Sequence, residues 1–173
     1  MCSSDLFRGR RLVSPEGRDT RPTTEKVREA VFNALGSLDL VDDAEVVDLY
    51  AGTGALGLEA LSRGAARCTF VENDRAALEA LRHNIDHLGV ADRSRVVRGD
   101  ALSAVGSLAG DLLLADPPYG VAPWDELLAS TTADFVVAEA PTEVAAPDGW
   151  EAVRARRYGR TWVTFLEIGR AHV

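Results

Sequence analysis

The spacing of apolar residues predicts a helix followed by a strand, a turn and a second helix. Between residues 23 and 38 apolar side chains recur every three or four positions, the period of one helix face, and Pro22 stands at the start. A β-branched run follows at 45–51 and stops at Gly52, as a buried strand does at a turn. A second helical pattern covers residues 55–63.

The same alternation continues through the middle of the chain. Short apolar runs predict strands at 68–72, 95–98, 111–116 and 134–139, and helical patterns predict helices at 74–88 and 124–129. Strands that alternate with helices form βαβ units, in which neighbouring strands run parallel. We therefore expect an α/β fold built on a parallel sheet.

The last strands depart from this alternation. Residues 150–157 and 161–166 have strand patterns, and the three residues between them suit an antiparallel hairpin. We expect a Rossmann-like, mostly parallel sheet that ends in this hairpin, with a helix on the N-terminal side. No linker interrupts residues 7–167, which we expect to form a single domain.

The two ends of the chain can be encoded by one short DNA segment read in opposite directions. Residues 168–173 can be written in codons whose reverse complement encodes Asp-Val-Cys-Ser-Ser-Asp, and the chain begins Met-Cys-Ser-Ser-Asp. This segment resembles a sequencing-library adapter. We therefore interpret residues 1–6 and 168–173 as adapter-derived and leave them out of the fold prediction.

Composition limits the class of protein. A chain of 173 residues with 46% hydrophobic residues fits one packed domain, and no run approaches the roughly 20 apolar residues of a membrane span. We expect a cytoplasmic protein with no membrane partner. Two cysteines make no disulfide framework, and His83 and His87 lack a third ligand, so we expect no metal.

The charge is unevenly distributed. A net charge of −8 argues against a nucleic-acid partner, because Lys and Arg drive phosphate binding. However, residues 1–28 and 150–173 each carry a net charge of +3, which leaves −14 on the rest. This pattern allows a locally positive face for a polyanionic substrate, with ordinary surface charge as the alternative.

Glycines gather where the first expected strand of the sheet turns into a helix. Gly52, Gly54 and Gly57 lie there, and glycine lets a ligand approach the backbone closely. Glu72 ends the next strand and is placed to accept hydrogen bonds from ribose hydroxyls, as in nicotinamide cofactor sites. Asp48, however, would repel a pyrophosphate and attract the ammonium group of S-adenosylmethionine. The alternatives are a structural turn and a solvated strand end.

The motif Asp-Pro-Pro-Tyr at residues 116–119 ends another strand of the expected sheet. The prolines fix the loop, and a rigid exit from the strand is the alternative interpretation. The carboxylate and a main-chain carbonyl can accept the two N–H bonds of a nucleobase amine and aim its lone pair at a methyl donor. The tyrosine would stack on the base. Asp100, after the third strand, could accept from an adenine amine or cap a helix.

Four segments together resemble one known family. Residues 21–37, 48–64, 70–75 and 116–120 are similar, in order and spacing, to the bacterial small-subunit ribosomal RNA guanine N2-methyltransferases, the RsmD family. The resemblance implies the class I S-adenosylmethionine-dependent methyltransferase fold. It also implies S-adenosylmethionine as methyl donor and one guanine of 16S rRNA in the small ribosomal subunit as substrate.

The resemblance implies roles for matching residues. The implied cofactor-binding residues are Asp48, Tyr50, Ala51, Gly52, Gly54, Glu72, Asn73, Asp100 and Ala101, and the implied catalytic residues are Asp116, Pro117, Pro118 and Tyr119. We expect RNA contacts from Arg10, Arg11, Arg21, Thr23 and Trp124, with surface arginines and a packed tryptophan as the alternatives. The family's basic strand segment ahead of residues 9–12 is replaced here by the suspected adapter residues, which would weaken RNA binding.

The sequence leaves other functions open. The same fold and motif serve adenine N6 in DNA and, with Asn in first place, a protein glutamine. The glycine turn alone would suit a nicotinamide-dependent oxidoreductase, and the fold alone a non-catalytic cofactor-binding fragment. We expect a monomeric enzyme whose partner is ribosomal RNA.

Overall fold

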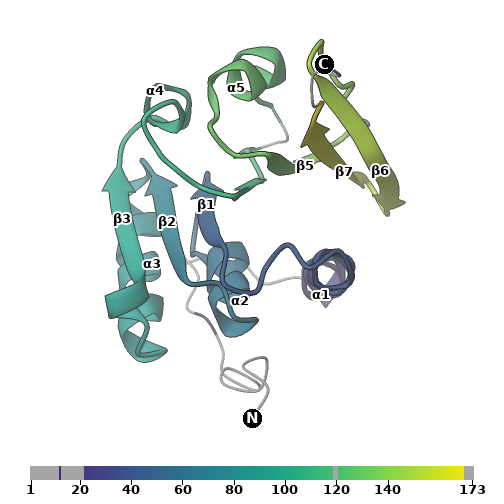
Figure 1. The fold of residues 1–173 in the computed structure, drawn as a ribbon. Helices are drawn as coiled ribbons and strands as arrows, with labels where there is room; N and C mark the ends of the chain where they lie inside the picture. Colours follow the sequence, from purple (N-terminus) through teal and green to yellow (C-terminus); the bar gives the residue numbers. More distant parts are fainter. Residues whose placement is uncertain (1–11, 13–21, 119–120, 170–173) are drawn as a thin grey trace.

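Seven strands form one mixed sheet in the order β3-β2-β1-β4-β5-β7-β6 (Figure 1). The computed structural model describes residues 12, 22–118 and 121–169. The strands are β1 Glu45–Leu49, β2 Arg67–Glu72, β3 Ser94–Arg98, β4 Leu112–Ala115, β5 Phe135–Ala140, β6 Trp150–Tyr158 and β7 Thr161–Ile168. Strands β1 to β5 run parallel, and β7 is antiparallel to both β5 and β6. The predicted sheet and its terminal hairpin are confirmed.

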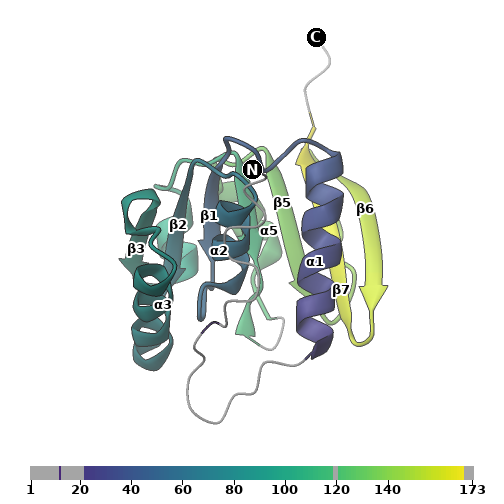
Figure 2. The same ribbon diagram turned by 90° about the horizontal axis from the view of Figure 1, so that it is seen from below.

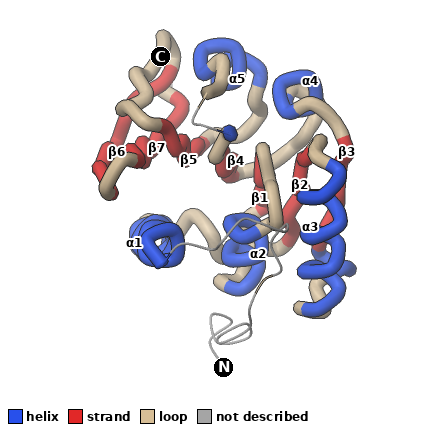
Figure 3. The backbone as a smooth tube through the Cα atoms, turned by 180° about the vertical axis from the view of Figure 1, so that it is seen from behind, coloured by secondary structure: helices blue, strands red, loops and turns tan. Residues whose placement is uncertain are grey.

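Helices cover both faces of the sheet. They are α1 Pro22–Ser37, α2 Ala55–Ser62, α3 Arg75–His87, α4 Ala101–Val105 and α5 Trp124–Ser130, with a 3-10 turn at Ala91–Arg93. Helices α1, α2 and α3 lie on one face, and α4 and α5 on the other (Figures 1 and 3). Each face buries its own cluster of apolar side chains, as expected for a sheet between two helical layers.

Helix α1 packs beside the hairpin. Val27, Val31, Phe32 and Leu35 are buried at the helical spacing predicted from the sequence. The helix runs alongside β7 and β6, and its N-terminal end lies at the same end of the molecule as the β6–β7 turn (Figure 2). The N-terminal part of the described chain is thereby brought near the carboxyl ends of the parallel strands.

Strand β4 is shorter than the sequence pattern predicted. It covers Leu112–Ala115, whereas the expected run was 111–116. Asp111 precedes the strand, where its carboxylate accepts a hydrogen bond from the Glu45 backbone N–H at 2.9 Å. Asp116 follows the strand. Asp111 and Asp116, the polar residues at the two ends of the apolar run, therefore lie outside the strand. Asp111 binds the backbone at the start of β1 instead.

Gly57 brings α2 close to the sheet. A Cβ atom built on Gly57 would clash with the side chains of Phe70 and Cys68 and would lie 3.0 Å from Oδ2 of Asp48. These residues belong to β1 and β2, so the missing side chain sets the distance between helix and sheet. The third glycine of the turn is required for packing.

We expect Gly57→Ala to destabilise the protein by about 1–3 kcal/mol, because an added methyl group overpacks a filled interior. Gly36→Ala is the matched control, since a Cβ there meets no atom within 4 Å. Alanine in place of glycine in a helix stabilises by up to about 1 kcal/mol. Urea unfolding of both variants tests this contrast, and equal effects would contradict the packing argument.

Candidate active site

The turn between β1 and α2 forms the first part of the site. Tyr50, Gly52 and Gly54 have positive φ angles of 59°, 58° and 87°, so the chain curls back before α2 begins. A Cβ on Gly54 would lie 2.5 Å from Cδ1 of Leu81, whereas a Cβ on Gly52 would meet no atom within 4 Å. Gly54 therefore packs against the protein, while the space beside Gly52 is open to a ligand.

Glu72, at the end of β2, holds this turn in place. Its Oε1 accepts a hydrogen bond from the Gly52 N–H at 2.8 Å, and its Oε2 accepts from the N–H groups of Asn73 and Asp74 at 2.7 and 2.8 Å. A carboxylate has about four acceptor positions, so the half-buried side chain can still accept from a ligand hydroxyl. Glu72 therefore supports the turn in addition to any ligand contact.

Asp48 is buried beneath the turn. The residue is 1% exposed, and its Oδ2 accepts a hydrogen bond from the Gly57 N–H at 2.9 Å. Burial raises the pKa of Asp48 well above its ordinary value, the Gly57 hydrogen bond opposes this, and the charges of Asp116 and Glu72 raise it further. The hydrogen bond that Asp48 accepts comes from the backbone of Gly57 in α2. Its expected contact with a cationic cofactor therefore stays a prediction.

Asp100 caps helix α4 and remains exposed. Its Oδ2 accepts from the backbone N–H of Ser103 at 3.0 Å and from its hydroxyl at 2.9 Å. The neighbouring Ala101 is buried, and the Gly99 N–H donates to the carbonyl of Glu72 at 3.1 Å. The capping alternative raised by the sequence is confirmed. An exposed capping carboxylate at the same strand edge is compatible with the cofactor contact, which stays a prediction.

Asp116 lies immediately after β4, next to the end of β5. Ala115 pairs with Ala138, so the residues that follow each of them, Asp116 and Glu139, lie side by side. Their side chains are hydrogen-bonded to each other. Pro117 is buried, and the carbonyl of Pro118 accepts a hydrogen bond from the Val121 N–H at 3.2 Å. The backbone after β4 is therefore hydrogen-bonded across the motif, and the expected contact of the motif with a nucleobase amine stays a prediction.

The two carboxyl groups share one proton near neutral pH. Desolvation raises the pKa of Asp116 to about 6, although the hydrogen bond from Glu139 lowers it. Desolvation and the charge of Asp116 raise the pKa of Glu139 to about 8. Because the pKa of Glu139 is raised further than that of Asp116, we expect Glu139 to carry the proton near neutral pH and Asp116 to accept it. Asp116 is exposed as a residue, although the protein around its carboxyl group removes enough water to raise its pKa.

Asp48, Asp116 and Glu139 lie on the same face of the sheet. Val46, Leu114 and Val137 pack in the cluster beneath α1 to α3, and side chains two residues apart on a strand share a face. The charge of Asp48 also raises the pKa of Glu139. Three carboxyl groups therefore meet where β1, β4 and β5 end.

Sequence reasoning missed Glu139. The apolar pattern of residues 134–139 predicts a buried strand and assigns no role to Glu139, its last residue. The available signal was a single acidic residue at the carboxyl end of the buried run Phe135–Ala140. Its meaning depends on the strand order, because only the pairing of β4 with β5 places it beside Asp116.

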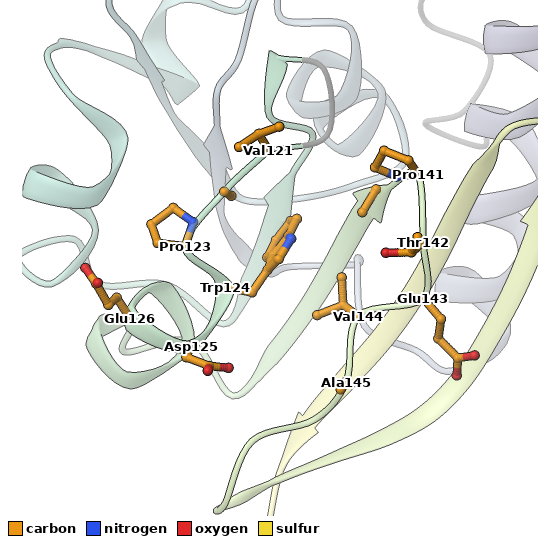
Figure 4. Close-up of a pocket in the computed structure, with 12 residues that line it drawn as sticks. Val121, Pro123, Trp124, Asp125, Glu126, Pro141, Thr142, Glu143, Val144 and Ala145 are labelled. Carbon is orange, nitrogen blue, oxygen red and sulfur yellow. The ribbon is translucent and has the colours of Figure 1, made fainter.

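A pocket of about 660 Å³ borders the same edge of the sheet, between residues 121–126 after β4 and 140–145 after β5. Figure 4 shows Trp124 on one side of this pocket and Thr142 and Val144 on the other. Trp124 is half-buried and packs against the cluster beneath α4 and α5. It therefore both packs and lines the pocket, which lies toward α5 rather than around the carboxyl pair.

Several expected site residues fall outside the described part of the chain. These are Arg10, Arg11, Arg21 and Tyr119. The backbone of Thr23 lies in the first turn of α1, and its side chain is not among the described ones. Their predicted contacts stay predictions.

The described residues also bear on the questions of a metal site and of a membrane span. Within residues 12, 22–118 and 121–169, no group of three His, Cys, Asp or Glu residues is arranged to hold a metal ion. His83 and His87 stack with ring centroids 6.1 Å apart. None of the described helices is long and apolar enough to cross a membrane.

A protein-family model described as Conserved hypothetical protein 95 matches residues 3–167. The chain is 35% identical to the Bacillus subtilis protein named "Putative rRNA methyltransferase YlbH", over 92% of this chain and 94% of that one. It is 44% identical to Ribosomal RNA small subunit methyltransferase D of Escherichia coli, over 65% of this chain and 57% of that one.

Solved structures share the fold. "Putative methyltransferase yhhF from Escherichia coli" superposes with a TM-score of 0.81 at 34% identity, covering 94% of both chains. The crystal structure of "SMU.776, a putative methyltransferase complexed with SAH" gives a TM-score of 0.66 at 14% identity, over 86% of this chain and 50% of that one. The second likeness concerns the fold alone.

The fold and the glycine turn, with the Asp-Pro-Pro segment after β4, define a class I S-adenosylmethionine-dependent methyltransferase. The chain belongs to the RsmD family, whose model matches nearly its whole length. The expected family, fold class and cofactor class are confirmed.

We expect the free energy of unfolding to fall as pH rises from about 5 to about 9. The raised pKa values of Asp116 and Glu139 mean that the folded state binds more protons than the unfolded state in this range, so raising the pH favours unfolding. Glu139→Gln removes one titrating group and keeps a hydrogen-bond donor. Its Tm should therefore change less between about pH 5.5 and 8.5.

Glu29→Gln is the control for this measurement, because Glu29 is an exposed carboxyl on α1. Its Tm should follow the pH dependence of the unaltered protein. An identical pH dependence in all three proteins would contradict the shared proton.

Proposed function

We propose that the protein transfers a methyl group from S-adenosylmethionine to the exocyclic N2 amine of a guanine in 16S ribosomal RNA of the small subunit. The observation that carries this proposal is the accessible carboxylate of Asp116, bonded to Glu139 beside the glycine turn. Membership of the RsmD family supports ribosomal RNA as the substrate class. The enzyme is proposed to act in the cytoplasm as a monomer, with residues 7–167 as its single domain.

The residues at the strand ends fit S-adenosylmethionine. The space beside Gly52 is open, and Glu72 and the exposed Asp100 present acceptors for ribose hydroxyls and an adenine amine. The carboxyl groups of Asp48 and Asp116 favour the cationic ammonium and sulfonium groups. A dinucleotide pyrophosphate would be repelled there, which disfavours a nicotinamide cofactor. Bound S-adenosylmethionine supplies an electrophilic methyl group.

Asp116 acts on the acceptor nitrogen. One of its carboxylate oxygens is held by the proton of Glu139, and the other is free to accept an N–H from the guanine amine. This hydrogen bond orients the nitrogen lone pair toward the methyl group. Methylation would make this nitrogen acidic, and Asp116 would then accept its proton.

The RNA contacts of the proposal lie around this edge. Trp124 offers an aromatic face at the pocket after β4, and Tyr119 is proposed to stack on the base by its place in the motif. Arg10, Arg11, Arg21 and Thr23 are proposed to contact the RNA near the N-terminal end of α1. We propose that the base leaves its stack to reach Asp116, as other base-modifying enzymes require.

Methyl transfer from labelled S-adenosylmethionine to small ribosomal subunits tests the function directly. The subunits come from a strain that lacks its own guanine methyltransferase, and nucleoside analysis identifies the product. We expect labelled N2-methylguanine, with kcat reduced at least about 100-fold in Asp116→Ala, because a positioned acid–base group contributes about 10²–10⁴.

Asp86→Ala is the matched control, an exposed aspartate on α3, and it should retain full activity. Labelled N6-methyladenine in DNA or a methylated protein glutamine, with no guanine product, would contradict the proposal. So would an Asp116→Ala variant with unaltered activity.

The pH dependence of kcat tests the carboxyl pair. We expect activity to fall below about pH 6, where Asp116 is protonated, and above about pH 8, where Glu139 loses the proton it donates. Glu139→Gln keeps a hydrogen-bond donor at every pH, so its kcat should fall at low pH as in the unaltered protein but should not fall above about pH 8. Glu139→Ala removes the donor, so the fall of kcat at low pH should begin at a higher pH than in the unaltered protein. Identical profiles for the three proteins would exclude Glu139 from positioning Asp116.

A further inference from the structure

The β6–β7 hairpin carries a group of exposed arginines. Strand β6 is one of the two edge strands of the described sheet, and most of its side chains are exposed on both faces. Arg154, Arg156 and Arg157 lie on β6, and Arg160 lies in the turn to β7; all four are exposed. An arginine-rich edge strand in a chain of net charge −8 is a locally positive surface.

These arginines have few partners among the described residues. None of the four takes part in an ion pair there, since the ion pairs of the described chain join Arg63 to Glu59 and Arg75 to Glu79. The Nε–H of Arg157 donates to the Gly159 carbonyl at 2.8 Å, which holds that guanidinium at the turn. The remaining guanidinium N–H groups face solvent and are available to an anion.

The strand register places the hairpin turn at the edge of the sheet that holds the candidate site. Strand β7 runs antiparallel to β5, and Ala140, the last residue of β5, pairs with Trp162. The β6–β7 turn therefore lies beyond the carboxyl end of β5. The N-terminal end of α1 lies at the same end of the molecule (Figure 2).

Arg156 shares a row and a face with the carboxyl pair. Glu139 pairs with Val163, and Val163 pairs with Arg156, so the three residues point to the same side of the sheet. Two strand spacings of about 4.8 Å separate the backbones of Glu139 and Arg156 by about 10 Å. A long arginine side chain can span part of this distance. The sugar–phosphate backbone next to a base held at Asp116 would come within its reach.

We infer that the β6–β7 hairpin binds RNA backbone phosphates beside the target nucleotide through Arg156, Arg157 and Arg160. This inference rests on the proposed function and extends it by naming a surface for the substrate backbone. Arginine suits this role because its guanidinium makes paired hydrogen bonds to phosphate. Charged residues on an edge strand also prevent strands of different molecules from pairing, and the experiment separates these roles.

The test compares two charge-matched triple variants on the same small ribosomal subunits. The first is Arg156→Gln/Arg157→Gln/Arg160→Gln. The second is Arg67→Gln/Arg82→Gln/Arg95→Gln, three exposed arginines on β2, α3 and β3. The measurements are KM for the subunits, kcat at saturation, affinity for S-adenosylmethionine and the salt dependence of subunit binding by co-sedimentation.

We expect the hairpin variant to raise KM for the subunits at least tenfold, with kcat and S-adenosylmethionine affinity within twofold of the unaltered protein. The slope of log affinity against log salt concentration should decrease by about 2, because each lost phosphate contact removes about 0.7–0.9. The control variant should match the unaltered protein in both measurements.

Equal KM values and equal salt slopes in the two variants would overturn the inference and leave the arginines as protection of the edge strand. Methylation of the subunits by the hairpin variant with unchanged KM would also overturn the inference, while the proposed function stands. If the unaltered protein methylates no RNA yet binds subunits through the hairpin, the proposed function fails and the inference stands.

Discussion

Desolvated negative charge where β1, β4 and β5 end is the constraint on which the site depends. Asp48, Asp116 and Glu139 meet there, and burial without a cation disfavours their ionised forms. The protein reduces this cost in two ways. A backbone N–H of α2 binds Asp48, and a proton shared with Glu139 partly neutralises Asp116. The glycine turn and the close packing of α2 are needed to bring that backbone N–H within reach.

The same constraint separates two kinds of binding. A concentration of carboxyl groups attracts a sulfonium or ammonium ion and repels phosphate, so an RNA substrate cannot be held by its backbone at the reacting centre. Phosphate contacts have to lie around it. The arginines of β6 lie outside the acidic centre, and Arg156 is on the same face of the sheet. Of the two basic ends seen in the charge distribution, the C-terminal one lies mostly in the described part of the chain and supplies the arginines of β6 beside the acidic site.

Local patterns predicted much of this structure. The alternation of strands and helices, the terminal hairpin and the turn at Gly52 follow from apolar spacing and glycine positions. The Asp116–Glu139 pair could not be predicted, because its two members come from different strands and meet only through strand order and register. The burial of Asp48 was also hidden, since a motif places a carboxyl group along the chain but does not say which partner binds it.

The carboxyl pair discriminates among functional groups more than among bases. With one oxygen occupied by the Glu139 proton, Asp116 offers only acceptor sites. Exocyclic amines are donors and fit these sites, whereas the O6 and N7 atoms of guanine are acceptors and would be repelled. The amines of adenine and cytosine meet the same condition. The proposed selection of guanine therefore requires contacts outside the pair. The segments after β4 and β5, which line the pocket beside Trp124, border the same edge.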